Sequence, residues 1–146
     1  MEFAQKLSLR STNPVYLYRF SAVSKLNFFK HTMGLSEFEG ACHADDLFYL
    51  FKTFVDIEEG SKEWKTVKKM VRMWTNFAKY SNPTPKRDEL IQITWEPVTK
   101  TKINFLDICI HEFTPGQDPD RERFELWMSI VDSVYNNNSK KVKSNL

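Results

Sequence analysis

The chain is 146 residues long, which is the size of one ordinary domain. Its hydrophobic content of 41%, with 12 Phe, 5 Tyr and 4 Trp, predicts a buried core and excludes an intrinsically disordered chain. The chain has 21 Lys and Arg residues against 19 Asp and Glu residues. It therefore lacks the strong positive charge that is typical of nucleic-acid-binding proteins, and no nucleic-acid partner is expected. Two cysteines, Cys42 and Cys109, cannot form the disulfide framework of a small secreted scaffold, and one bridge or two free thiols both stay open.

Several kinds of segment are missing from the sequence. The first ten residues hold no apolar run of the signal-peptide type, and no apolar stretch approaches the roughly 20 residues of a membrane-spanning helix. These observations leave the compartment open and predict no transmembrane segment. No glycine-rich phosphate-binding motif occurs, so neither of the two common nucleotide-binding loops, and no cofactor, is expected.

The first half of the chain predicts short elements around a longer helix. A short helix is expected within residues 2–11, followed by a β-branched and aromatic strand over 15–20 with little alternation, which is typical of a strand covered on both faces in a sheet interior. Residues 26–40 predict a loop with at most one helical turn. Asp45 and Asp46 precede a short apolar segment at 47–51, so a carboxylate is expected to cap a helix there.

The second half predicts two helices separated by strand-like segments. Apolar residues repeat with a 3.6-residue period over 61–80, with Ser61 as the expected N-cap and the Asn-Pro-Thr-Pro at 82–85 as the stop. Residues 91–95 and 103–110 are strand-like and predict a ribbon on the surface. A second amphipathic helix over 119–135 is expected to pack on another element, and 136–146 predict a loose, polar and basic tail that holds a glycosylation sequon at Asn137.

Candidate chemistry rests on the histidines His31, His43 and His111, because histidine changes charge near neutral pH. His43 lies in Gly-Ala-Cys-His-Ala-Asp-Asp, a small-residue loop before a helix start, and loops of this kind often carry function. Cys42 beside it makes a poor nucleophile–base dyad, because adjacent residues of an extended segment point to opposite sides. No cluster of ligands has the spacing of a metal site, so no metal is expected.

The helix at 61–80 also carries a basic face opposite its apolar one. This pattern occurs in helices that bind membrane surfaces or partner proteins, but it is more often the solvated outer face of a core helix. The residues of this face are Lys62, Lys65, Lys68, Lys69, Arg72 and Lys79.

Taken together, several stretches resemble the C-terminal part of the type-B carboxylesterases, an α/β-hydrolase family that includes juvenile hormone esterases and cholinesterases. Residues 14–20 are similar to a late core strand of that family, and 40–51 to its catalytic-histidine loop with the helix that follows. The resemblance continues in order through 73–79 with the stop at 82–85, Trp95, 106–108 and 124–127. It implies an α/β fold in which 1–135 form the C-terminal part of a carboxylesterase domain and 136–146 form a tail.

The resemblance further implies a function for His43. In a carboxylesterase a histidine at this position is the general base that takes the proton of a serine hydroxyl during attack on a carboxylic ester. The sequence departs from the family pattern, because no G-x-S-x-G motif, no orienting acid upstream and no glycine-rich oxyanion loop occur in the 146 residues. The only site residue that the resemblance assigns is therefore His43.

These departures predict that the chain is a fragment of an esterase and that the fragment is inactive by itself. The complete enzyme would take a small carboxylic ester as substrate. The strand at 15–20 would lack its upstream neighbour, which predicts marginal stability and aggregation or pairing with another chain through the open sheet edge. A non-catalytic remnant that acts as an interaction or ligand-binding module is the alternative. Substrate preference and oligomeric state stay open at this stage.

Overall fold

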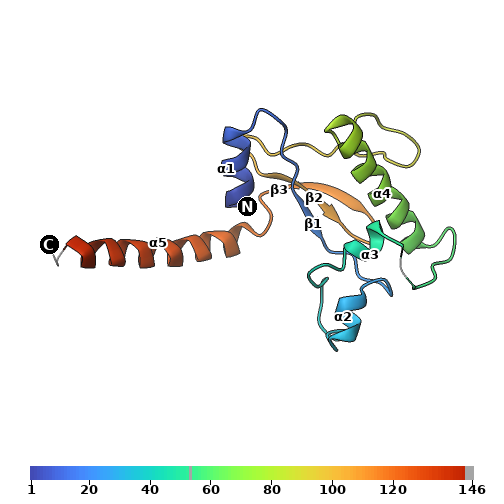
Figure 1. Ribbon diagram of the computed structural model, residues 1–146, viewed down its shortest axis with the longest axis horizontal. Coiled ribbons are helices and arrows are strands. Elements are labelled where there is room, and N and C mark those ends of the chain that lie inside the picture. The colour runs from blue at the N-terminus through green and yellow to red at the C-terminus, as the bar shows by residue number, and fades with distance from the viewer. Residues whose placement is uncertain (53, 144–146) are drawn as a thin grey trace.

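A computed structural model describes residues 1–52 and 54–143, and for 136–143 it describes the backbone alone. Within these residues, five helices and three strands follow one another (Figure 1). The loop that carries His43 lies between α2 and α3. Their order and bounds are α1 (Glu2–Arg10), β1 (Tyr18–Phe20), α2 (Phe28–Thr32), α3 (Leu47–Leu50), α4 (Lys62–Tyr80), β2 (Asn104–Ile108), β3 (Phe113–Gln117) and α5 (Arg121–Lys143).

The three strands form one mixed sheet in the order β1-β2-β3. β1 pairs in parallel with β2, with Tyr18 opposite Leu106 and Phe20 opposite Ile108. β2 pairs with β3 in antiparallel register, from Asn104 opposite Gln117 to Ile108 opposite Phe113. β1 therefore lies at one edge of the sheet and β2 at its centre.

One face of the sheet carries the core. Because side chains alternate along a strand, Tyr18 and Phe20 share a face, and both project toward the helices that follow β1. The ring of Tyr18 lies 5.1 Å from that of Trp74 on α4, and the ring of Phe20 lies 5.0 Å from that of Tyr49 on α3, both edge-to-face. The buried cluster around these contacts comprises Ala22, Leu26, Tyr49, Met70, Met73, Ile91, Trp95, Leu106, Ile108 and Phe113.

The long helix α4 has the expected start and stop. The Ser61 side chain accepts a hydrogen bond from the Trp64 amide at 3.2 Å, and the helix ends at Ser81, which has a left-handed φ of 52°. Its buried residues are Thr66, Met70 and Met73. The basic residues lie on the outer side, where Arg72 pairs with Asp88 at 2.9 Å. This placement agrees with a core helix whose outer face is solvated.

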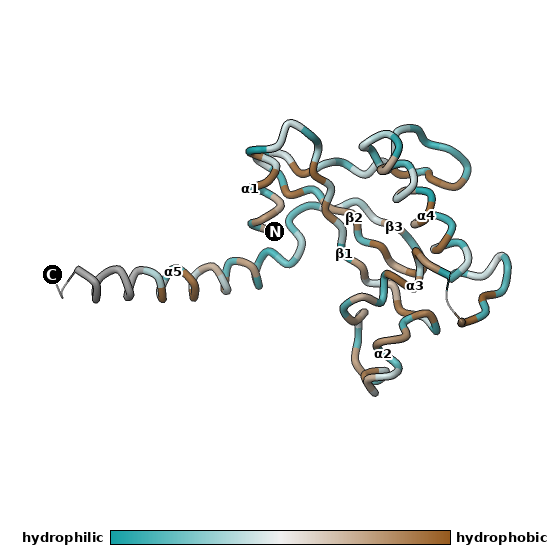
Figure 2. Tube along the Cα trace, viewed as in Figure 1, coloured by the Kyte–Doolittle hydropathy of each residue, from teal (hydrophilic) through white to brown (hydrophobic). Residues whose placement is uncertain are grey.

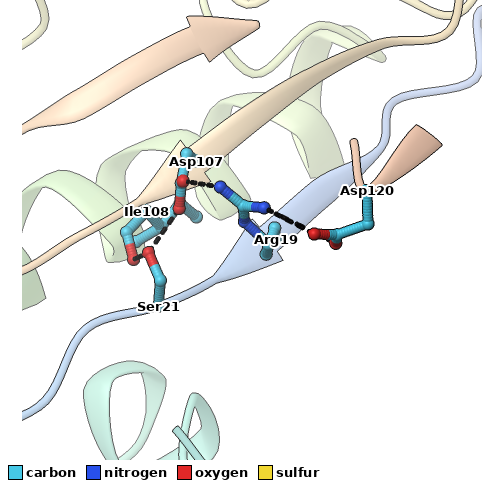
Figure 3. A network of polar contacts seen from close by, with 5 residues as sticks. All are labelled: Arg19, Ser21, Asp107, Ile108 and Asp120. Carbon is cyan, nitrogen blue, oxygen red and sulfur yellow. Dashed lines mark hydrogen bonds and ion pairs between the residues drawn. The ribbon is translucent and has the colours of Figure 1, made fainter. Parts of the chain in front are cut away.

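A polar network covers part of the opposite face of the sheet (Figure 3). Arg19 of β1 pairs with Asp107 of β2 and, at 3.4 Å, with Asp120 before α5, and the Ser21 hydroxyl donates to the second oxygen of Asp107. Partial burial pushes the pKa of the Asp107 carboxyl upward, but the hydrogen bonds from Arg19 and Ser21 outweigh it and hold that pKa below its usual range. The network ties both parallel strands to the start of α5.

The C-terminal helix α5 extends away from the rest of the molecule (Figure 1), and its apolar positions form brown bands along it in Figure 2. Trp127 is 64% exposed and Val134 is 53% exposed. The expectation that this helix packs on another element is therefore wrong for this structure. The helix also continues to Lys143, into the segment predicted as a loose tail, while 144–146 lie outside the described residues.

Three further expectations need correction. β1 is covered on one face only and exposes Arg19 on the other, whereas its place at an edge of the described sheet agrees with the predicted lack of an upstream neighbour. Residues 91–95 form no strand, and Ile91 and Trp95 are instead buried under α4 and β1. β2 is the central strand and not a surface ribbon, because β3, which contains Pro115 and Gly116, pairs with it on the side opposite β1.

We expect Ser61→Ala to lower the free energy of unfolding by about 1 kcal/mol, because the substitution leaves a helix N–H without its side-chain acceptor. Urea unfolding followed by far-UV circular dichroism measures the change. Thr75→Ala, at an exposed position in the middle of α4, is the matched control and should have a smaller effect. Equal stability of Ser61→Ala and the wild type would contradict the cap.

We expect Asp107→Asn to destabilise the chain at neutral pH and to lose this effect in acid. A carboxyl whose pKa is lowered by folding stabilises the folded state above its unfolded pKa of about 3.9, and this contribution disappears as the pH falls through the lower, folded pKa. Urea unfolding at several pH values between 7 and 2 measures the difference between the two proteins. A difference that stays constant across this range would contradict the network, and Asp132→Asn on the exposed side of α5 is the control.

Candidate functional site

His43 is exposed and lies in the turn that leads into α3, in the loop between α2 and α3. A histidine general base needs a nucleophile at one ring nitrogen and an orienting acceptor at the other. Within residues 1–52 and 54–143, no hydrogen bond or ion pair engages the His43 imidazole. The residues around His43 act on the backbone of the loop and not on the ring.

Asp45 closes the turn that carries His43. One of its carboxylate oxygens accepts hydrogen bonds from the Cys42 amide at 2.8 Å and from the Asn27 side-chain amide at 2.9 Å. The other oxygen accepts from the Lys30 amide in α2 at 3.4 Å. Asp45 and Asn27 are both fully buried, so these bonds form away from solvent, where an unpaired donor or acceptor is costly. Asp45 thereby fixes the His43 turn against α2.

Asn27 connects this turn to the core. Its amide nitrogen also donates to the Ala22 carbonyl at 2.9 Å, and its oxygen accepts from the Tyr49 hydroxyl at 3.0 Å and from the Ser24 amide at 2.7 Å. Burial raises the pKa of the Tyr49 hydroxyl to about 12, so this group stays protonated and remains a donor at neutral pH. The buried network therefore joins the segment after β1, the His43 turn and α3.

The backbone of the loop is unusual on both sides of His43. Gly40 has a φ of 82° and Ala44 a φ of 68°, in the left-handed region that costs a non-glycine residue about 1–2 kcal/mol. The buried Lys30 ammonium donates to the carbonyls of Phe38 at 2.5 Å and Gly40 at 2.7 Å, which holds the entry to the loop. A strained alanine beside His43 is kept in place by these surrounding bonds.

The two aspartates act differently from the predicted helix cap. Asp46 occupies the N-cap position of α3 but its side chain makes no cap hydrogen bond. Its carboxylate instead accepts from the Tyr18 hydroxyl of β1 at 2.7 Å. Burial and this bond to Asp46 raise the pKa of Tyr18, which keeps the hydroxyl protonated as a donor. The aspartates thus attach the loop to β1 and α2 in place of capping α3.

The other candidates from the sequence are placed elsewhere. Both ring nitrogens of His31 have local partners, the Ser36 hydroxyl at 2.9 Å and the Ser24 carbonyl at 3.1 Å. His111 is exposed in the turn between β2 and β3. Cys42 and Cys109 are free thiols, and the described residues contain no group of three or more potential ligands that would hold a metal ion.

Sequence reasoning missed Asn27 and Lys30, the two buried polar residues that support the His43 loop. They lie in a stretch without a clear period, and a polar side chain in such a stretch gives no signal of burial. Only the contact between this stretch and the loop identifies their function.

Comparisons with known proteins assign the family of this chain. The family model described as "Carboxylesterase family" matches residues 1–127. This chain belongs to the carboxylesterase family. Bile salt-activated lipase of Rattus norvegicus is 34% identical over 110 residues, which are 74% of this chain and 17% of that lipase. Juvenile hormone esterase of Tribolium castaneum is 28% identical over 132 residues, which are 83% of this chain and 22% of that esterase.

Solved structures agree on the fold. The crystal structure of juvenile hormone esterase from Manduca sexta with OTFP covalently attached matches 92% of this chain and 25% of its own, with a TM-score of 0.69 and 28% identity. A PNB esterase structure matches 84% of this chain with a TM-score of 0.60 and 20% identity, which bears on the fold alone. The chain has a partial α/β-hydrolase fold, as the sequence predicted, and spans about a fifth of the length of the curated relatives that it matches.

No helix in the described part of this carboxylesterase-family chain is long and apolar enough to cross a bilayer.

We expect Asp45→Ala to lower the free energy of unfolding by about 2–3 kcal/mol, because it leaves buried donors of Cys42, Asn27 and Lys30 unpaired. Chemical denaturation measures this change, and hydrogen exchange at the Cys42 amide reports on the loop itself. Asp56→Ala, at an exposed position, is the control and should change neither quantity by much. Unchanged exchange at Cys42 in Asp45→Ala would contradict the role of Asp45.

Proposed function

We propose that this chain is the catalytic-histidine part of a serine carboxylesterase and that His43 is its general base. The observation that carries the proposal is the exposed position of His43 in a loop whose backbone is fixed by buried hydrogen bonds, in a chain of the carboxylesterase family. In the complete enzyme His43 takes the proton of the serine hydroxyl while the serine oxygen attacks the carbonyl carbon of a carboxylic ester. His43 then gives this proton to the departing alcohol, and in the second half of the reaction it activates the water that hydrolyses the acyl-enzyme.

We further propose that the 146 residues alone do not hydrolyse esters. Neither a G-x-S-x-G segment nor a glycine-rich oxyanion loop occurs among them, and His43 has no orienting carboxylate within the described residues. An imidazole without a nucleophile and an orienting acid catalyses ester hydrolysis only weakly. The nucleophile and the orienting acid belong to residues outside this sequence.

An interaction module of the same fold is the second candidate, and the exposed apolar residues favour it. The side chains of Phe77 on α4 and Trp127 on α5 are 47% and 64% exposed, and β1 forms an open sheet edge. Such surfaces pair with other chains or aggregate. The two candidates make different predictions for a complete fold that contains this chain. The catalytic candidate predicts ester hydrolysis, and the interaction module predicts none.

A single-chain fusion tests the catalytic proposal. The part of the Manduca sexta juvenile hormone esterase that precedes its matched segment is joined to residues 1–146, and hydrolysis of p-nitrophenyl acetate is measured. We expect the fusion to hydrolyse the ester with burst kinetics and His43→Ala to lower kcat by about a thousandfold or more, as removal of a triad histidine does.

The 146-residue chain by itself and the fusion with His111→Ala are the controls. The chain alone should show no burst, and the exposed His111 should be dispensable for activity. A folded fusion that keeps its activity in His43→Ala, or a folded fusion without activity, would overturn the proposal. A burst from the 146-residue chain alone would overturn the proposed inactivity.

A further inference from the structure

A hollow lies between the start of α4 and the turn that joins β2 to β3. Its volume is about 170 Å³, which is room for several water molecules or one small anion. Its walls belong to α4, to that turn and to the first residue of β3, and none belongs to β1. We refer to it as the lysine hollow. The residues that line it are Lys62, Lys65, Thr66, Lys69, Cys109, Ile110, His111 and Phe113.

The walls of the lysine hollow are held together by contacts between α4 and the turn. The hydroxyl of the buried Thr66 donates to the Ile110 carbonyl at 3.5 Å, and the Lys69 ammonium lies 5.3 Å from the centre of the Phe113 ring. Within the turn, the Cys109 amide donates to a backbone carbonyl three residues further on at 3.1 Å. The hollow is therefore part of the folded arrangement and not a gap between two loose segments.

Three ammonium groups gather at the lysine hollow without a counter-charge. Lys62, Lys65 and Lys69 are spaced by three and four residues, so they lie on one face of α4. The lining contains no carboxylate, and among residues 1–52 and 54–143 no ion pair engages these three lysines. A concave site with charges of one sign and low-dielectric walls concentrates its electric field. The lysine hollow therefore attracts an anion.

Neighbouring carboxylates leave this charge uncompensated. Glu63, the acidic residue in the first turn of α4, acts on the Tyr49 hydroxyl, on the side of α3. Glu112 lines the adjoining hollow and forms no ion pair with the three lysines in the described structure. The start of α4 is also the positive end of its dipole, and Lys62 is its first residue. A bound anion would relieve the repulsion among these positive groups.

The chemistry of the three lysines selects the class of anion. A lysine ammonium is a compact point charge without the planar fork of arginine, so it suits a tetrahedral oxyanion. A phosphate monoester carries close to two negative charges at neutral pH and three accepting oxygens, one for each lysine. We propose that the lysine hollow binds a phosphate monoester group through Lys62, Lys65 and Lys69. The proposal does not depend on the proposed function, because the hollow contains no residue of the His43 loop.

Titration calorimetry of the 146-residue chain with glycerol phosphate, a soluble phosphate monoester, tests the proposal. We expect saturable binding at low ionic strength that weakens as salt is added, since salt screens charges at the surface. Acetate at the same ionic strength should bind about tenfold more weakly, because it carries a single charge. A titration without saturable binding, or acetate binding as tight as that of glycerol phosphate, overturns the proposal.

Charge-matched variants locate the site. Lys62→Gln and Lys65→Gln should each weaken binding by about fivefold or more, while Lys79→Gln, which removes the same charge from the far end of α4, should change it by less than about twofold. Glu112→Gln should tighten binding, because it removes a carboxylate from the adjoining hollow. Circular dichroism establishes that each variant is folded. Equal weakening by Lys65→Gln and Lys79→Gln would show attraction to the general surface charge and would overturn the site.

The same group occurs in soluble metabolites and in the headgroup of phosphatidic acid, and vesicles distinguish the two sources. Phosphatidylcholine vesicles that contain phosphatidic acid are compared with vesicles of equal surface charge that contain phosphatidylserine. Sedimentation with the first kind alone, lost in Lys65→Gln, assigns the site to the lipid headgroup. Binding of glycerol phosphate without sedimentation assigns it to a soluble ligand. Sedimentation that depends on Lys79 as much as on Lys65 contradicts the site.

Discussion

The parallel pairing of β1 with β2 is the constraint on which the rest of this structure depends. The two strands are far apart in sequence, with Tyr18 opposite Leu106, and a parallel pair requires a long connection that crosses one face of the sheet. That connection contains α2, the His43 loop, α3 and α4. Every element near the candidate site is therefore held in the crossover between these two strands, and the core forms where the crossover packs on Tyr18 and Phe20.

The loop of His43 gains its shape from polar groups placed where apolar ones would be expected. Asn27 and Asp45 are fully buried, and each is satisfied by several hydrogen bonds to backbone and side chains. A buried network of this kind adds little net stability, since its bonds replace bonds to water, but it strongly disfavours other arrangements that would leave a member unpaired. It therefore fixes the backbone of the loop that carries His43.

The sequence predicted some features well because they depend on local interactions. The helix at α4 follows from a 3.6-residue period and the Ser61 cap, and both signals lie within the segment itself. Strand placement was predicted less well, because the centre or edge of a sheet depends on which distant strands pair. β2 was taken for a surface ribbon for that reason, and β3 was missed because Pro115 and Gly116 suggested a break.

The sequence by itself determined the family, because a run of residues in fixed order is a local property of the chain. It also determined the positions of the short helix at the N-terminus and of the long helix α4. The tertiary structure alone decided that Asp45 binds Asn27 and that Asp46 accepts a hydrogen bond from the Tyr18 hydroxyl. These features join residues that are distant in the chain, and their energies arise from burial, which no single segment specifies.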